Sequence, residues 1–107
     1  MKNLNLVAML TMVALAGCAS TEISPQAKNV RVISDQQAHA CKFIDHVSSN
    51  NGNTLMGNPE EDAKNKALNR VAALGGNALH ITSTNSQIAP SGVGSIFTLS
   101  GEAYLCK

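Results

Sequence analysis

The feature that most constrains the fold of this 107-residue chain is one well-delimited helical segment in its second half. Asn58 is a favourable N-cap residue, Pro59 suits the first helical position, and Glu61 stands at the third position, as in a capping box. Gly75-Gly76 supplies a left-handed stop. Between these signals the apolar residues recur at helical spacing, at Ala63, Ala67, Leu68, Val71 and Leu74. The pattern predicts an amphipathic helix whose alanines suit close packing on a sheet.

Four segments with alternating apolar residues flank this helix, at residues 29–34, 41–48, 77–84 and 95–106. Gly101, inside the last segment, indicates a bulge or bend. The order β-β-α-β-β predicts an α+β fold in which one helix covers a small four-stranded mixed sheet. A right-handed crossover then makes the second and third strands parallel.

The second strand segment has no cleanly apolar face. Strict alternation places Phe43 and Val47 on one side and Ile44 and His46 on the other. Residues 35–39 are interpreted as a connector.

Two loops complete the reading of the domain. The loop 48–58 holds only two apolar residues, Leu55 and Met56, which form either a recognition spot or packing under the loop. Residues 85–94 contain Pro90 and two glycines, and predict a long mobile loop.

The start of the chain predicts export. Lys2 precedes an apolar run over residues 6–16 that is too short to span a bilayer, and small residues follow it. A signal peptide is therefore expected over residues 1–17. Leu15-Ala16-Gly17-Cys18 resembles the bacterial lipoprotein box. The alternative is an ordinary secretory leader, with Cys18 a plain thiol.

By this resemblance Cys18 carries a diacylglyceryl thioether and a fatty acyl group such as palmitate on its amine. Ala19 stands where an aspartate would retain a lipoprotein in the inner membrane, so the sorting rule implies the outer membrane, facing the periplasm. Residues 18–28 are polar, contain Pro25 and are interpreted as a flexible tether. A single domain is expected over residues 29–107.

Charge excludes one class of partner. Without Lys2, seven of the eight basic residues remain to balance seven acidic ones. This balance leaves no electrostatic footprint for nucleic acid, so membrane contact is assigned to the lipid anchor alone.

Two cysteines remain besides Cys18. Cys41 and Cys106 form an even pair in an exported small domain, which is most simply a disulfide. The redox-active alternative has little support because no Cys-x-x-Cys motif is present.

Several of these segments together resemble a known family. Val30-Arg31-Val32, Cys41-Lys42-Phe43, the helix 63–70, the run Ala72-Ala73-Leu74-Gly75-Gly76-Asn77 and the final Cys106 are similar to the uncharacterised lipoprotein family called domain of unknown function 4156. More distantly, the layout is similar to the Rcs outer-membrane stress-sensor lipoprotein, which implies a small disulfide-bonded domain that signals by contacting envelope proteins. This chain has fewer cysteines and a shorter tether than that sensor, and the resemblance transfers no functional residue.

Candidate chemistry is sparse. His46 and His80 fall on the same side of strands interpreted as neighbours and, with His39 and Asp45, suggest a metal site, but their spacing matches no ligand signature. Asp45, Glu102 and Ser100 could serve as acid, base and nucleophile, yet no nucleophile motif positions them.

No enzyme activity and no cofactor are therefore expected. We expect a lipid-anchored binding or envelope-maintenance module with a protein or cell-wall partner. The alternative is a metal-binding or metal-sensing lipoprotein.

Overall fold

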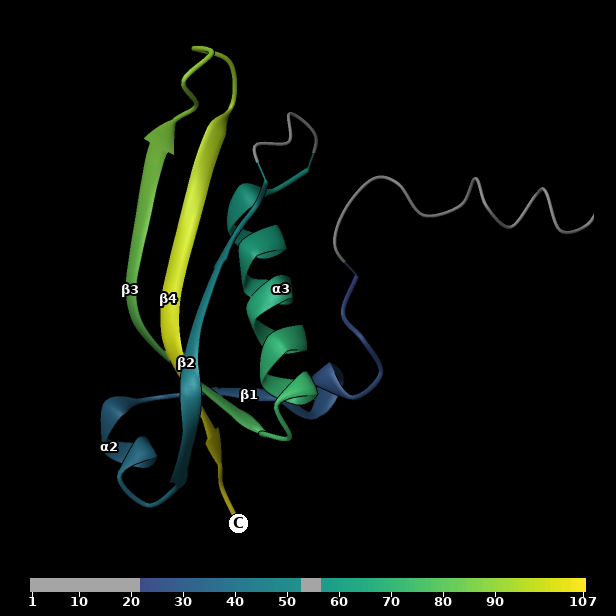
Figure 1. Ribbon diagram of the computed structural model, residues 1–107, viewed down its shortest axis with the longest axis vertical. Helices are drawn as coiled ribbons and strands as arrows, with labels where there is room; N and C mark the ends of the chain where they lie inside the picture. The colour runs from purple at the N-terminus through teal and green to yellow at the C-terminus, as the bar shows by residue number, and fades with distance from the viewer. Residues whose placement is uncertain (1–21, 53–56) are drawn as a thin grey trace, which may run out of the picture.

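The computed structural model describes residues 22–52 and 57–107 of the chain. A four-stranded sheet lies against one long helix, and a short helix lies near one end of the sheet (Figure 1). The elements follow in the order η1 (Ala27–Asn29), β1 (Arg31–Ile33), α2 (Asp35–Ala38), β2 (Lys42–Asn50), α3 (Pro59–Ala73), β3 (Ala78–Ile88) and β4 (Ser95–Leu105). The expected signal peptide, Cys18 and the apolar pair Leu55 and Met56 lie outside the described residues.

The sheet has the strand order β1-β3-β4-β2. Strand β1 pairs parallel to β3, whereas β4 pairs antiparallel to both β3 and β2. The strands before and after the long helix, β2 and β3, therefore run parallel with β4 between them. This arrangement confirms the α+β class, the mixed four-stranded sheet and the single main helix.

The long helix α3 begins and ends where the sequence predicts. The Asn58 side chain accepts hydrogen bonds from the backbone N–H groups of Glu60 and Glu61, at 3.0 and 3.3 Å. Gly75 takes a positive φ of 86° just after the helix. The stripe residues Ala63, Ala67, Leu68 and Val71 are buried. They pack with Val47, Leu79, Leu99 and Ala103 of the sheet, and this layer between α3 and the sheet is the main core.

A β-bulge in β2 overturns the strict alternation predicted for that strand. The register against β4 shifts between Phe43 and Asp45. As a result, Ile44 and Val47 both pack in the main core, while Phe43 and His46 lie together with ring centroids 5.2 Å apart. The bulge is the reason why neither face of this strand reads as apolar in the sequence.

Two segments that the sequence predicts as loops contain regular structure. Residues 35–38 form helix α2 rather than a plain connector, with Ser34 as its N-cap. Strand β3 continues through Ile88, and Asn85 to Ile88 pair with β4, so only residues 89–94 turn the hairpin. The β3–β4 hairpin extends past the start of α3 (Figure 1).

The segment that leads into the domain is docked on α3. The side-chain amide of Asn69 accepts from Ser24 N and donates to Glu22 O, both at 2.8 Å. Ile23 packs against the main core, and Ala27 is buried within it. Residues 22–28, which the sequence places in the flexible tether, are thus part of the folded unit, because an asparagine amide pairs with their backbone as a strand would.

A second, smaller core lies on the opposite face of the sheet, beneath α2. It contains Ile33, Ala38 and Ala78, with Tyr104 and the two cysteines packed against it. Cys41 and Cys106 lie at disulfide distance, with 2.03 Å between the two Sγ atoms, as the sequence predicts. Within the described residues, no helix has the length and apolar character needed to cross a membrane.

Candidate functional site

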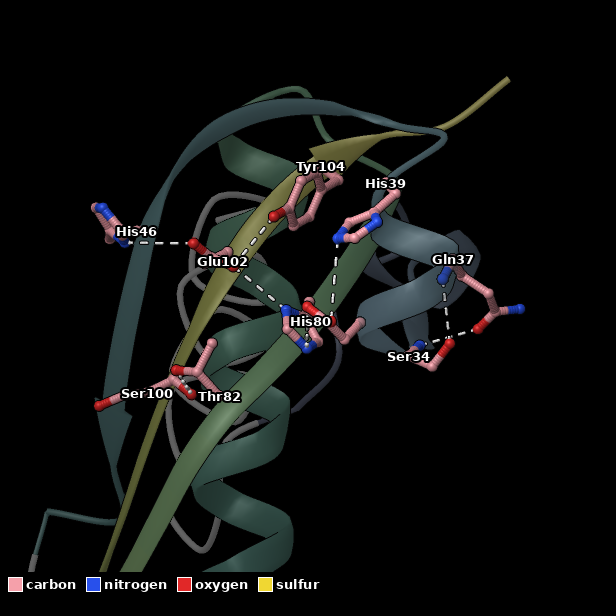
Figure 2. A network of polar contacts seen from close by, with 10 residues as sticks. Ser34, Gln37, His39, His46, His80, Thr82, Ser100, Glu102 and Tyr104 are labelled. Atoms are coloured by element: carbon pink, nitrogen blue, oxygen red, sulfur yellow. Dashed lines mark hydrogen bonds and ion pairs between the residues drawn. The ribbon is translucent and has the colours of Figure 1, made fainter.

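Polar side chains form a row across three strands, on the face of the sheet opposite α3, which we call the outer face. In the strand register, Glu102 of β4 lies opposite His46 of β2 on one side and opposite His80 of β3 on the other. Residues opposite each other in register project to the same face, so the three side chains stand side by side. Figure 2 shows both histidines directed toward the central carboxylate.

Glu102 is the meeting point of this row. Its Oε1 accepts a hydrogen bond from Tyr104 Oη at 3.0 Å and lies 3.2 Å from His80 Nδ1. Its Oε2 lies 4.0 Å from His46 Nδ1. An ionised carboxylate can only accept, so the contact with His80 requires the hydrogen to be on Nδ1.

Helix α2 extends the row from the other side. Asp35 Oδ1 lies 4.0 Å from His80 Nε2, and Asp35 Oδ2 lies 4.0 Å from His39 Nε2. We call the set His39, Asp35, His80, Glu102, His46 and Tyr104 the polar cluster. Imidazoles and carboxylates alternate along it from His39 to His46.

A capping box holds α2 in the position that brings Asp35 to the cluster. Ser34 Oγ accepts from Gln37 N at 3.2 Å, and Gln37 Oε1 accepts from Ser34 N at 2.9 Å. This reciprocal pair fixes the first turn of a helix of only four residues. Asp35 stands in that turn.

The contacts within the polar cluster shift the pKa values of two of its members, Glu102 and Tyr104. Hydrogen bonds from His80 and then Tyr104 lower the pKa of Glu102 below its ordinary value of 4.5, although burial acts in the opposite direction. Burial, and then the hydrogen bond to Glu102, raise the pKa of Tyr104 above its ordinary value of 10.0. Both shifts favour an ionised carboxylate and a neutral phenol at neutral pH.

The two histidines of the row differ in accessibility. The side chain of His80 is 14% exposed and that of His46 is 79% exposed. Phe43 borders the row, with its ring centroid 5.2 Å from His46 and 5.8 Å from Tyr104. The polar cluster therefore has a largely buried part around His80 and an exposed part at His46, which Phe43 borders.

The structure brings together some of the residues singled out in the sequence and separates others. His46 and His80 share a face, as predicted, but β4 lies between their strands, so they are not on neighbouring strands. Asp45 Oδ1 accepts from His46 N at 2.8 Å. Over residues 22–52 and 57–107, no three histidine, cysteine or acidic side chains are grouped so as to hold a metal ion.

Sequence reasoning missed Asp35 and Tyr104 as members of the cluster. The spacing of Ser34 and Gln37 is a capping-box signature and could have identified α2, and with it the placement of Asp35 in a first turn. No local signal identifies Tyr104, because its partner Glu102 becomes central only through the register of three strands.

Two hollows in the surface lie away from the cluster. One of about 460 Å³ is lined by Ser24, Gln26, Asn69, Ala72 and Ala73, where the docked segment meets α3. Another of about 310 Å³ is lined by Asn58, Pro59, Glu60, Ser86, Ser95 and Phe97. The polar cluster is instead displayed on the sheet surface, which suits contact with a partner more than enclosure of a small substrate.

Comparison with known proteins gives a family and close relatives in enteric bacteria. The family model described as domain of unknown function (DUF4156) matches residues 21–106. The chain is 31% identical over 100 residues to the uncharacterized protein YjeI of Escherichia coli strain K12, and the match covers 86% of each protein. The same values hold for the proteins of that name in Escherichia coli O6:H1 and in Shigella flexneri.

Proposed function

This chain belongs to the DUF4156 family, and we propose that it is a lipoprotein of the bacterial envelope whose domain is a non-catalytic binding module. In this proposal a lipid on Cys18 holds the domain at the periplasmic side of the outer membrane. The module contacts a protein or cell-wall partner there and serves envelope maintenance or stress sensing. The lysine, the short apolar run and Leu15-Ala16-Gly17-Cys18 support the anchor.

The observation that carries the binding role is the polar cluster on the outer face. Among the described residues, helix α3 covers the other face of the sheet and α2 lies over one end of the outer face (Figure 1), with the two cysteines packed against the small core beneath it. Beside α2, three strands present His46, Glu102 and His80 in a row, in which hydrogen bonds join Glu102 to His80 and Tyr104. A row of fixed donors and acceptors next to an exposed aromatic ring is typical of a binding surface.

The cluster contains donors, acceptors and imidazoles, which suit recognition. A serine or cysteine nucleophile paired with a histidine is not among its members. Ser100 lies two residues before Glu102 on β4, where its carbonyl oxygen accepts a hydrogen bond from Thr82 Oγ1 at 3.1 Å. The proposal is therefore of a module that binds rather than one that reacts.

In-cell photo-cross-linking tests the proposal. A photoreactive residue at His46, on the exposed part of the cluster, is compared with one at Lys64, which is exposed on α3. We expect a discrete adduct from position 46 that is absent from position 64 and lost in a Cys18→Ala variant. Equal adducts from both positions, or none from position 46, would contradict the outer face as the binding surface.

Metal binding is the second candidate, because His46 and His80 flank the same carboxylate. Its test is a zinc and copper titration of the protein with His46→Ala and His80→Ala variants as controls. Saturable uptake that both substitutions abolish would replace the binding-module proposal with a metal site. We expect no such uptake, because the described residues form no preorganised set of three ligands.

A further inference from the structure

The outer edge of strand β3 is unpaired over most of its length. Strand β1 pairs only with residues 78–80 of β3, and β4 occupies the other side of the strand. In the part of the chain that the structure describes, no strand lies along the outer edge of Thr82–Ile88, and every residue of that segment is exposed (Figure 1). This edge offers a row of backbone N–H and C=O groups to a further strand.

The edge lacks the features that protect most edge strands. Residues 82–88 read Thr-Ser-Thr-Asn-Ser-Gln-Ile, without a charged residue or a proline. Proteins usually prevent pairing at such edges with lysine, proline, a very short strand or a bulge. The bulge of β3 lies at Ile81–Ser83, at the lower limit of the segment, and leaves the remainder regular.

We propose that this edge pairs with the same edge of a second copy of the chain, in antiparallel orientation about a two-fold axis at Asn85. Because β1 occupies the edge at residues 78–80, the free window is centred on Asn85. Pairing about that centre sets Thr82 opposite Ile88 of the partner copy and joins the two sheets into one. This inference goes beyond the proposed function and requires neither the lipid anchor nor the polar cluster.

A second copy fits the edge better than an unrelated peptide. A strand that recognises a foreign peptide selects it through pockets for alternate side chains, whereas the small Ser, Thr and Asn residues that make up most of this segment favour pairing through the backbone. Self-pairing brings no like charges together, because the segment is uncharged. It also covers Ile88, which is 74% exposed, with a β-branched cross-strand partner in Thr82.

A charge exchange at position 85 tests the pairing in the full chain. Two copies with different affinity tags are expressed together, and their co-purification is measured. Like charges directly opposite each other destabilise a strand pair, so Asn85→Lys or Asn85→Asp alone should lower co-purification about fivefold. Co-expression of the lysine variant with the aspartate variant should restore it to the wild-type amount or above.

Ser91→Lys, at the exposed tip of the same hairpin, is the matched control and should leave co-purification unchanged. Circular dichroism of each variant verifies that it is folded. The proposal is overturned if wild-type copies do not co-purify or if Asn85→Lys has no effect. It is also overturned if both variants lose co-purification and their mixture does not regain it, which would show that residues 85 of the two copies are not paired.

Discussion

At the scale of single residues, Glu102 links more of the fold than any local pattern indicates. It lies opposite His46 and His80 in the register, and its carboxylate accepts from Tyr104 on its own strand. Through His80 it is also connected to Asp35 of α2. Its charge therefore affects both the outer face of the sheet and the contact of α2 with that face.

This role predicts a dependence of stability on acid. Because the pKa of Glu102 is lower in the folded protein than its ordinary value of 4.5, its ionised form favours folding. The contribution is fully present above about pH 4.5 and is lost as the pH falls through the folded-state pKa. The difference in unfolding free energy between wild type and Glu102→Gln, measured by urea denaturation, should be constant above pH 5.5 and shrink towards pH 3. A difference in unfolding free energy that stays constant down to pH 3 would contradict the stabilising role of the ionised Glu102.

Tyr104 predicts a loss of stability at alkaline pH. Because its pKa is raised above 10.0 in the folded protein, its neutral form favours folding. Its contribution is present below about pH 10.0 and is lost as the pH rises through the folded-state pKa. Tyr104→Phe, which has no ionisable group at this position, is the control for the alkaline measurement.

At the scale of elements, Gly101 determines how closely β4 approaches its two neighbours, β2 and β3. It pairs with Val47 of β2 and Ile81 of β3, next to the bulge in β3. A Cβ added at Gly101 would lie 2.5 Å from the carbonyl oxygen of His80 and 3.1 Å from Leu79 Cδ1. The strands thus approach at a distance that only glycine permits. The bulge that the sequence predicts at Gly101 lies instead on the neighbouring strand β3, at Ile81–Ser83, opposite Gly101.

Gly101→Ala should therefore destabilise the protein by about 2 to 3 kcal/mol, because backbone must move to admit the methyl group. Chemical denaturation monitored by circular dichroism measures the change. Ser100→Ala, one residue earlier on the same strand, should change the unfolding free energy by less than about 0.5 kcal/mol. Similar losses for the two variants would show that close strand approach is not the cause.

The elements also show which features a sequence can predict. Helix α3 was predictable because its signals are local: Asn58, Pro59, the alanine stripe and Gly75 all lie within it or at its ends. The strand order was not, because β1 pairs with β3 across the whole of β2 and α3. The polar cluster depends on that same non-local register, and so only its separate histidines and Glu102 could be singled out.

At the scale of the whole molecule, the two cysteines connect the start of β2 to the end of β4. Cys41 and Cys106 are 65 residues apart, and both pack against the small core beneath α2. That core has only three buried residues, Ile33, Ala38 and Ala78. A covalent link is therefore expected to contribute much of the stability at this end of the sheet.

Replacing both cysteines by alanine should lower the unfolding free energy by about 4 kcal/mol, as expected for a closed loop of this length. Hydrogen exchange should rise first in β1 and α2, whereas the amides of α3 stay protected longer. Thiol labelling of the protein isolated from cells without reductant provides the independent check. Full labelling of Cys41 and Cys106, or a loss below about 1 kcal/mol, would contradict a structural disulfide.

The hydrogen bonds between the Asn69 side chain and the backbone of Glu22 and Ser24 limit how far the domain can lie from a lipid on Cys18. With a lipid on Cys18, only residues 19–21 separate the anchor from the docked segment. Even fully extended, the chain from Cys18 to Glu22 spans at most about 14 Å. Under the proposed anchoring, a domain with so short a connection would not reach across the periplasm. It would diffuse with its lipid in the plane of the leaflet, and a partner would have to approach that plane to bind it.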